Sequence, residues 1–342
     1  MEKKTIRIKF VGFWYGFDYQ TFPIYKMLTE MYNVELSDTP DYIFYSCFGE
    51  NNFDELDYDC VHIFYSGENT SPNFNIFDYA IGYDDITYND RFYQSQPFLT
   101  EQPLDKAVHK HEGVTEQTLA DKTEFCNFVV GNGKGMEERT RIFQLLNEYK
   151  NVASVGTYLN NRDGFVVHNV QEKYDFQKKC KFSIAFESVR QRNFITEKIM
   201  QAFAAQTVPI YLGDESIGDI FNEKAFIDVQ KFGSLEEVVK EVERLDQDDA
   251  AYLEMLRQPA FVQQDYTAVR LAGLKEFLRN IFDQPLEKAY RRPRKFIPQR
   301  HSDDIKAYLN LKRNVRFQRY LACNDNALVR LALRLAKPKN TR

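Results

Sequence analysis

Apolar and polar positions along the chain form short apolar runs separated by longer mixed segments. Runs at Thr5–Val11, Tyr42–Cys47 and Val61–Tyr65 have the length and the aromatic or β-branched content of buried strands. Between the first two, Thr21–Tyr32 has the pattern of a helix, and a further apolar run follows at Phe77–Tyr83. Strands that alternate with helices in this way indicate an α/β fold with a mainly parallel sheet.

A second α/β series begins after a polar stretch, at about residues 100–123, that shows no clear periodicity. We place the boundary there, with an N-terminal domain at 1–120 and a C-terminal domain at 121–282. The simplest architecture is two Rossmann-like units with a cleft between them. The second unit is expected to contain strands at Phe125–Val130, Phe182–Phe186 and Val208–Leu212, an apolar stretch at Ala225–Val229, helices at Met136–Tyr149, Glu197–Ala205, Ser234–Leu245 and Ala250–Leu256, and a helix ending near Phe282.

Composition fits two ordinary globular domains, because the 342 residues are 43% hydrophobic and 28% charged. No apolar stretch reaches the roughly 18–20 residues that span a bilayer, and the first residues lack the apolar segment of a secretory signal. We therefore expect a cytoplasmic protein. The five cysteines are odd in number and far apart, which predicts reduced, mostly buried thiols. The five histidines are scattered, and no zinc or Ser/His/Asp spacing stands out.

Charge is distributed unevenly along the chain. From Lys288 onward there are 16 Lys and Arg against three Asp, a net charge of +13, so the first 287 residues carry −18. Such a basic tail, at residues 283–342, indicates an anionic partner. Within it, residues 327–337 have apolar positions at helical spacing with cations beside them, which suits an amphipathic helix on an anionic membrane surface. The alternative is a helix docked on the core or on a second subunit; nucleic acid is not expected.

Two short motifs resemble ligand-binding motifs, one for a nucleotide and one for a metal ion, but each has a simpler structural explanation. The glycine-rich loop Gly131–Gly135 fits neither common phosphate-binding spacing, so a flexible strand-to-helix turn is the favoured explanation. The pair Asp57 and Asp59 has the look of a divalent-metal motif, yet it lies in a polar segment typical of a solvated turn. The sequence therefore predicts no metal site.

The block at residues 186–213 concentrates the chemistry. A buried strand ends in Glu187 and Ser188, a polar loop with two arginines follows, and Thr196 can cap a helix that begins at Glu197 and Lys198. A lysine in the first turn of a helix is unfavourable to the helix dipole. An anion bound at the helix N-terminus would account for Lys198, although the side chain could also point into water.

This block resembles the motif of the α1,3-fucosyltransferases, family 10 glycosyltransferases of the bacterial type. The matching residues are Phe186-Glu187-Ser188, Phe194-Ile195-Thr196-Glu197-Lys198 and Val208-Pro209-Ile210-Tyr211-Leu212-Gly213. Upstream, FYSGENTSPNFNIFDYAIGYDD at 64–85 is similar to the acceptor-domain segment of bacterial members. The resemblance covers roughly residues 5–280 and leaves the basic tail outside.

The resemblance implies a GT-B fold, with two Rossmann-like domains facing a cleft and the sugar nucleotide held by the C-terminal one. It implies transfer of L-fucose from GDP-β-L-fucose, with inversion, to O3 or O4 of N-acetylglucosamine in lactosamine-type glycans, which forms Lewis-type antigens. No metal or other cofactor is implied. A lipid-linked acceptor at the membrane would fit the basic tail, and a homodimer stays open.

The resemblance also assigns roles. Glu68, at the end of an apolar run in the N-terminal domain, matches the family's proposed base, although the stretch alone would suit an exposed turn glutamate. Lys198 and Arg139 would hold the GDP phosphates, with Arg141 as the fallback for Arg139. Glu197 would accept hydrogen bonds from ribose hydroxyls.

Four further positions complete the candidate site. Glu187 belongs either to the donor site or to the support of its loop. Ser188 and Phe194 stand where relatives often have Asn and Tyr, so Phe194 cannot donate a hydroxyl hydrogen bond. Trp14, the single tryptophan, follows the first strand and is a candidate for stacking on the acceptor sugar.

Two alternatives to fucosyl transfer stay open. One is a GT-B transferase with another nucleotide-sugar donor, and the other is a non-catalytic module that binds a glycan or a nucleotide.

Overall fold

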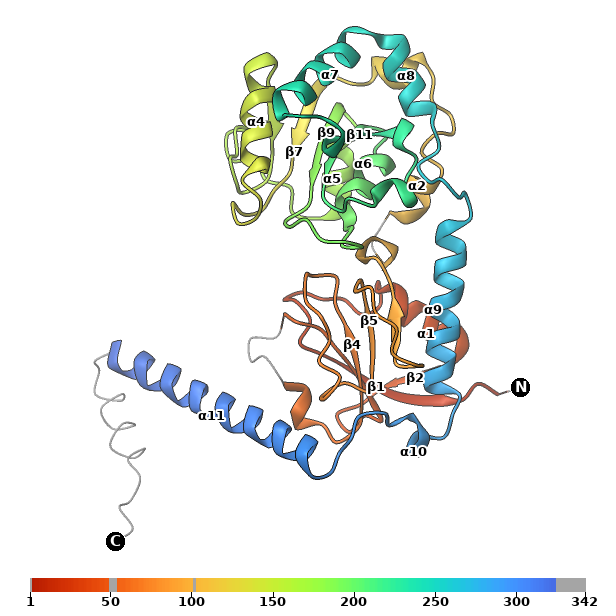
Figure 1. Cartoon of the computed structure of the whole chain (residues 1–342), viewed down its shortest axis with the longest axis vertical. Coiled ribbons are helices and arrows are strands. Elements are labelled where there is room, and N and C mark those ends of the chain that lie inside the picture. Colours follow the sequence, from red (N-terminus) through yellow and green to blue (C-terminus); the bar gives the residue numbers. More distant parts are fainter. Residues whose placement is uncertain (1, 49–53, 101–102, 324–342) are drawn as a thin grey trace.

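A computed structural model describes residues 2–48, 54–100 and 103–323, in two α/β units placed end to end (Figure 1). Each unit is built on a wholly parallel sheet, which confirms the expected α/β architecture. In the described part, the chain crosses between the units twice: first through the segment after β6 (Phe92–Gln94) and again through α9 (Tyr266–Phe282).

The N-terminal unit has a six-stranded sheet in the order β2-β1-β3-β4-β5-β6. Every residue of β4 and of β5 is buried, because parallel strands are covered on both faces. Neighbouring residues of one strand alternate between faces, so Ile63 belongs to the core on one side and Phe64 to the core on the other. The elements are β1 (Thr5–Val11), α1 (Pro23–Met31), β2 (Asn33–Leu36), β3 (Tyr42–Tyr45), η1 (Asp54–Asp57), β4 (Val61–Tyr65), β5 (Tyr79–Gly82) and β6 (Phe92–Gln94).

The C-terminal unit has a five-stranded sheet in the order β11-β10-β9-β7-β8. Its central strand β9 (Cys180–Phe186) is buried along its whole length and pairs with β10 and β7. The remaining elements are β7 (Glu124–Phe128), α4 (Glu138–Tyr149), β8 (Val152–Ser154), α5 (Val170–Gln177), α6 (Glu197–Ala204), β10 (Val208–Leu212), η3 (Ile217–Asp219), η4 (Glu223–Ala225), β11 (Ile227–Asp228), η5 (Val229–Lys231), α7 (Leu235–Gln247) and α8 (Asp249–Arg257).

The polar stretch expected to be a plain boundary contains short helices where it is described. These are η2 (Pro97–Thr100), α2 (Leu104–Val108) and α3 (Glu116–Ala120). Phe98 and Ala107 are fully buried against α6, so the connection is packed onto the C-terminal unit. Short helices of this kind are stabilised by tertiary packing, and their periodicity in sequence is too brief to detect.

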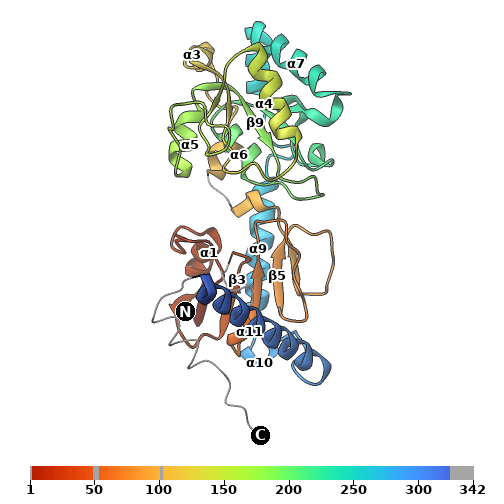
Figure 2. The same ribbon diagram turned by 90° about the vertical axis from the view of Figure 1, so that its left-hand side faces the viewer.

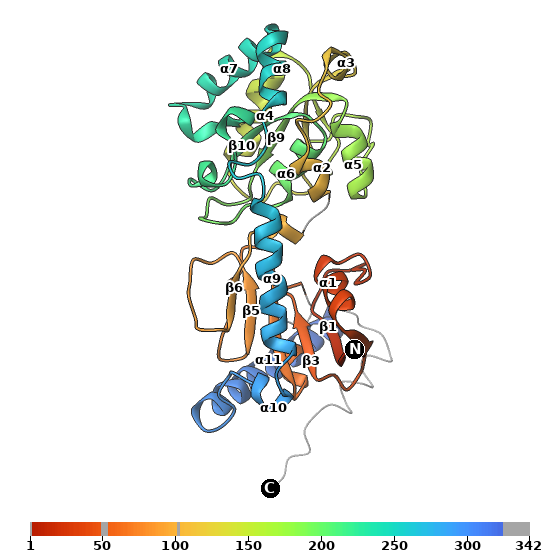
Figure 3. The ribbon, with the colours of Figure 1, turned by 90° about the vertical axis from the view of Figure 1, so that its right-hand side faces the viewer.

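Helix α9 corrects the domain assignment made from sequence. It begins against the C-terminal unit, but Leu274, Leu278 and Ile281 are buried in the core of the N-terminal unit. Figure 3 shows it running alongside β6, and the hydroxyl of Tyr93 in that strand donates to the carbonyl of Arg270. The last turns of this helix therefore belong to the N-terminal unit, although the sequence placed everything up to residue 282 in the other one.

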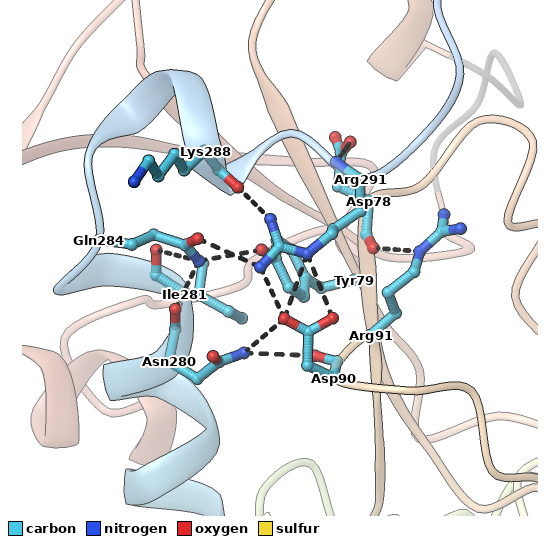
Figure 4. A network of polar contacts seen from close by, with 9 residues as sticks. All are labelled: Asp78, Tyr79, Asp90, Arg91, Asn280, Ile281, Gln284, Lys288 and Arg291. Atoms are coloured by element: carbon cyan, nitrogen blue, oxygen red, sulfur yellow. Dashed lines mark hydrogen bonds and ion pairs between the residues drawn. The ribbon is translucent and has the colours of Figure 1, made fainter.

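The segment after α9 fastens onto the N-terminal unit. Arg291 forms an ion pair with Asp90 at 2.6 Å and bonds Gln284 at 3.1 Å (Figure 4). Arg292 pairs with the fully buried Asp78, which also accepts from the backbone N–H groups of Arg291 and Arg292, each at 2.8 Å. We call residues 284–292 the C-terminal strap. The basic charge of the tail indicated an anionic partner outside the chain. Arg291 and Arg292, however, pair with carboxylates of the same chain.

The strap contains α10 (Leu286–Ala289), and α11 (Ile297–Cys323) follows it. Figure 2 shows α11 across the N-terminal unit, where Ile305 packs against the core that contains Phe64 and Phe77. The amphipathic segment 327–337 lies outside the described residues. Among the helices that the structure describes, none has the length and apolar content to cross a bilayer.

Candidate active site

The functional residues of the two units face each other across the gap between them. The ring of Phe194 in the C-terminal unit lies 5.1 Å from that of Tyr83 in the N-terminal unit, and Arg192 lies 3.6 Å from Asp85. Glu68 follows the carboxyl end of β4, and Glu187 follows that of β9. In parallel α/β sheets, ligands bind at this end of the strands.

Glu68 stands on a turn that buried Ser66 holds in place. The Ser66 hydroxyl accepts from the Glu68 N–H at 3.0 Å and donates to the Glu68 carbonyl at 3.1 Å. The next residue, Asn69, accepts a 2.6 Å hydrogen bond from the Tyr83 hydroxyl. These contacts fix the backbone of the turn and leave the Glu68 side chain exposed. Ser66 thus holds the backbone that carries Glu68.

The surroundings of Glu68 raise the pKa of its carboxyl. The principal cause is desolvation by the surrounding protein, and the charges of Glu197 and Glu187 act in the same direction, while Lys198 opposes them. All three of these partners belong to the opposite unit, so the carboxylate lies within electrostatic range of the C-terminal site. A carboxylate with a raised pKa is a stronger base once it is ionised.

Glu187 lies beneath the C-terminal site rather than on its surface. It is fully buried, and its two oxygens accept from the Thr196 N–H at 2.8 Å and the Thr196 hydroxyl at 2.7 Å. One of them also contacts Lys198 Nζ at 3.1 Å. Of the two roles expected from sequence, these contacts give Glu187 the supporting one: it anchors the first turn of α6 and the lysine on it.

Lys198 is held as an ammonium at the N-terminus of α6. Burial acts against its charge, but Glu187 and Glu197 outweigh this and raise the pKa of Lys198. Its side chain keeps 22% of its surface exposed. The lysine that helix-dipole reasoning disfavours is therefore stabilised by two carboxylates and still accessible to a ligand.

Glu197 remains ionised beside it. Burial acts to raise the pKa of Glu197, but the charges of Lys198 and Lys173 and the free N–H groups of the helix end outweigh burial and lower the pKa to about 2. With 32% of its side chain exposed, this carboxylate can accept hydrogen bonds from a bound hydroxyl.

Arg139, in the first turn of α4, is buried against the end of β9. Its Nε and Nη2 donate to the Phe186 carbonyl at 3.1 and 3.0 Å, and burial lowers the pKa of its guanidinium. Arg141 is exposed and pairs with Glu236 at 3.1 Å, away from these residues. The structure thus brings Arg139 to the site and leaves the fallback outside.

The geometry of the glycine-rich loop requires glycine at its last position, Gly135. Gly135 has φ of +133°, and a Cβ there would lie 3.0 Å from Arg139 Nη1 and 3.2 Å from the Ser188 carbonyl oxygen. Only glycine fits that conformation and that close approach without strain. The loop is therefore part of the wall beside Arg139, in addition to being a strand-to-helix turn.

Phe194, Ser188 and Trp14 have different surroundings. Phe194 is 1% exposed and contacts Tyr83 edge to face, so it joins the two units. Ser188 is half-buried and its carbonyl accepts from the Met136 N–H at 3.2 Å. Trp14 is 42% exposed and packs edge to face on Phe17, which leaves ring surface open near the end of β1.

Sequence reasoning missed Lys173. It lies on α5, a helix that the sequence analysis did not predict, and it lines a hollow together with Arg139 and Lys198. It also missed a cavity of about 480 Å³ between two loops of the C-terminal unit, lined by Arg190, Arg192, Asp214 and their neighbours. A lysine on an unpredicted helix gives no local signal, whereas the two arginines were visible in the 186–213 block.

The metal motif considered from sequence has another environment. Asp59 is 91% exposed and forms an ion pair with Arg294. Among the described residues, no group of three or more His, Cys, Asp or Glu is arranged to hold a metal ion. Of the cysteines, Cys60, Cys126 and Cys180 are buried free thiols and Cys47 is a half-buried one.

Comparisons with known proteins agree with this arrangement. The family described as alpha-(1,3)-fucosyltransferase FucT N-terminal domain matches residues 8–100, and glycosyltransferase family 10 (fucosyltransferase) C-term matches residues 119–270. The Helicobacter pylori alpha-(1,3)-fucosyltransferase FucT is 28% identical over 272 residues, 68% of this chain and 55% of that protein. A putative fucosyltransferase of Acanthamoeba polyphaga mimivirus is 24% identical over 246 residues, 68% of this chain and 39% of that one. The chain thus spans about half the length, or less, of these relatives.

Solved structures extend the likeness to three dimensions. A crystal structure of an α1,3-fucosyltransferase with GDP-fucose matches with a TM-score of 0.65 and 26% identity, over 82% of this chain and 92% of that one. Another α1,3-fucosyltransferase structure gives 0.68 and 25%, over 86% and 94%. The fold is that of the GT-B fucosyltransferases, and the chain belongs to glycosyltransferase family 10, the fucosyltransferases.

Proposed function

We propose that this chain transfers L-fucose from GDP-β-L-fucose, with inversion, to O3 of N-acetylglucosamine in a lactosamine-type glycan, with O4 as the alternative position. The observation that carries the proposal is the opposition of one carboxylate, Glu68, to the cations Lys198 and Arg139 across the gap between two units. A displacement needs a base such as Glu68 on the side of the acceptor and cations such as Lys198 and Arg139 beside the leaving group.

The reaction follows from these positions. The Glu68 carboxylate takes the proton of the acceptor hydroxyl as its oxygen forms a bond to the anomeric carbon of fucose. The bond from that carbon to the β-phosphate oxygen breaks, and its electron pair leaves with GDP. Attack on the face opposite the leaving group converts the β linkage of the donor into an α linkage. Lys198 and Arg139 stabilise the charge that grows on the diphosphate, and no metal step is needed in this scheme.

The ribose and the acceptor have partners in the same scheme. Glu197 accepts hydrogen bonds from the ribose hydroxyls, since it is ionised and partly exposed beside Lys198. Trp14 offers an aromatic face to the acceptor sugar. The ring of Phe13, the residue before Trp14, stacks on the ring of Tyr65 at a centroid distance of 6.2 Å. Tyr65 lies three residues before Glu68, so the segment that carries Trp14 contacts the strand that leads to the base.

The test is transfer from GDP-fucose to type 1 and type 2 disaccharides, with NMR of the linkage in the product. An α1,3 linkage is expected, and transfer from GDP-mannose in place of GDP-fucose would instead support another donor. Glu68→Gln should lower transfer by about 100- to 10,000-fold and leave GDP binding intact. Glu148→Gln, an exposed glutamate on α4, is the matched control. If Glu68→Gln transfers fucose normally, the assigned base is wrong. A wild-type chain that binds GDP or the glycan but transfers no sugar from either donor would favour a non-catalytic binding module.

We further propose that the enzyme is bacterial and cytoplasmic and binds an anionic membrane surface through its tail, where a lipid-linked acceptor is exposed. After Lys295 the chain has 11 Lys and Arg against three Asp, a net charge of +8, which supports this. So do the exposed apolar residues Ile297, Leu311 and Val315 on α11. A chain that ends at Lys295 keeps the C-terminal strap; it should lose binding to anionic vesicles and retain turnover on a soluble disaccharide. Unchanged vesicle binding would contradict the proposal.

A further inference from the structure

Three side chains stand at matching positions along one rim of the N-terminal sheet. Strands β1, β3 and β4 are neighbours in that sheet and run parallel, so their carboxyl ends lie at the same rim. Trp14, Phe48 and Glu68 are each the third residue beyond the end of one of these strands. The strand order therefore places Phe48 between Trp14 and the proposed base.

Direct contacts join the turns that carry these residues. The Phe48 N–H donates to the Gly12 carbonyl at 2.8 Å, which ties the turn after β3 to the turn after β1. On the other side, the Sγ atom of Cys47 lies 3.3 Å from the Oγ of Ser66, the residue whose hydroxyl holds the backbone of Glu68. The turn that carries Phe48 is thus fixed to both of its neighbours on the rim.

The rings of Trp14 and Phe48 form a corner that is open to solvent, which we call the aromatic corner. Their centroids lie 5.6 Å apart and their planes meet at 82°. Trp14 is 42% exposed and Phe48 is 40% exposed, although side chains of both types are usually well buried. Phe17 packs edge to face on Trp14 at a centroid distance of 4.8 Å, so the tryptophan ring is held in place without a ligand.

A pyranose ring suits the aromatic corner in shape and in chemistry. Aromatic side chains offer large apolar faces, and the C–H groups on the face of a pyranose pack on such surfaces while its hydroxyls project from its edge. A sugar that stacks on one ring of the corner meets the other ring at its edge, which restricts how it can turn. Its free hydroxyls then lie along the rim, where the Glu68 side chain is exposed.

We infer that Phe48 is an acceptor-binding residue, which forms with Trp14 a single corner for the acceptor sugar. The inference rests on the proposed function for the identity of that sugar, N-acetylglucosamine in a lactosamine unit, and for the role of Glu68. Phe48 positions the sugar so that a hydroxyl on its edge lies toward the carboxylate. Since Phe48 belongs to the N-terminal unit, binding of the donor by the C-terminal unit should not depend on it.

The experiment measures steady-state transfer to the type 2 disaccharide by the full chain, with the acceptor and GDP-fucose varied in turn. Phe48→Ala should raise the KM for the acceptor about 10-fold, which corresponds to about 1.4 kcal/mol and lies within the range of an aromatic contact. The KM for GDP-fucose should stay unchanged. Phe48→Tyr keeps the ring and should keep the acceptor KM. The matched control is Phe296→Ala, which removes a phenylalanine that is 89% exposed and lies beyond the C-terminal strap.

Three outcomes would overturn the inference. The first is an unchanged acceptor KM in Phe48→Ala, and a change in oligomeric mass beside it would make the corner an interface between copies of the chain. The second is an equal rise in both KM values, which would mean that Phe48 acts through the structure of the rim. The third is an equal loss in Phe48→Tyr and Phe48→Ala, which would show that the ring is not the cause. Thermal unfolding of each variant excludes loss of the fold.

Binding of the disaccharide without donor, followed by saturation-transfer NMR, repeats the comparison independently of turnover. Phe48→Ala should weaken this binding by the same factor. A wild-type chain that binds the disaccharide but transfers no fucose would refute the proposed function alone, whereas normal transfer and equal disaccharide binding in wild type and Phe48→Ala would refute this inference alone.

Discussion

Replacing Arg292 with methionine should destabilise the N-terminal unit by about 3–5 kcal/mol. Asp78, its partner, is fully buried, and the Arg292 side chain is only 10% exposed, so solvent screens the pair little. Removing one member of a buried ion pair leaves a charge without compensation, and that range is typical of the loss. Three backbone N–H groups, those of His62, Arg291 and Arg292, still donate to Asp78 at 2.8 Å, which favours the lower end of the range.

The assay is urea denaturation followed by fluorescence, because Trp14 is the only tryptophan and lies in the N-terminal unit. Arg294→Met is the matched control. Its partner Asp59 is 91% exposed, and exposed pairs contribute less than about 1 kcal/mol. A loss below about 1 kcal/mol for Arg292→Met, or an equal loss for both variants, would refute the account of the C-terminal strap as a structural part of this unit.

Three further predictions concern the site and the core. The acid limb of kcat/KM should lie above the ordinary glutamate pKa of about 4.3, because Glu68 must be ionised and its surroundings raise its pKa; a limb at or below pH 4 would contradict this assignment. Gly135→Ala should weaken GDP binding about 10-fold, because φ of +133° and the 3.0 Å approach to Arg139 Nη1 both exclude a Cβ. The control is Gly113→Ala, which has φ of +68° and open space at its Cβ; it should lower stability but leave GDP affinity unchanged. Burial lowers the pKa of His62 to about 3, so at intermediate pH the unfolded chain binds a proton that the folded chain excludes. The free energy of unfolding should therefore fall as pH drops from about 6.5 toward 3. His62→Gln should make that fall shallower, and an unchanged slope would show that His62 is not its source.

The strands that the sequence predicted are short apolar runs, and several of them are buried on both faces, whereas the mostly exposed β2 and the half-buried β6 give no such run. Thr5–Val11, Val61–Tyr65 and Val208–Leu212 are strands with the expected bounds. Helix α5 was not predictable in the same way, since Val170, its first residue, is exposed and the helix depends on its contacts with the sheet and α6.

The site was predictable where a motif places residues close together in sequence. Thr196, Glu197 and Lys198 form one turn, and their contacts with each other follow from that. The burial of Glu187 beneath them, and the choice of Arg139 over Arg141, depend on which side of a helix faces β9. A periodic pattern shows that a helix has an apolar face, but it does not identify the sheet that the face covers, which is why α9 was assigned to one unit only.

Helix α9 and the C-terminal strap have a consequence for the order in which the protein is made. The N-terminal unit needs Leu278 and Ile281 in its core and Arg292 beside Asp78, and these residues are synthesised only after the whole C-terminal unit. At a ribosomal rate of roughly 5–20 residues per second, the early sheet waits on the order of ten to forty seconds for its missing parts. During that time its apolar face is open to chaperones, so the unit translated first is the one completed last.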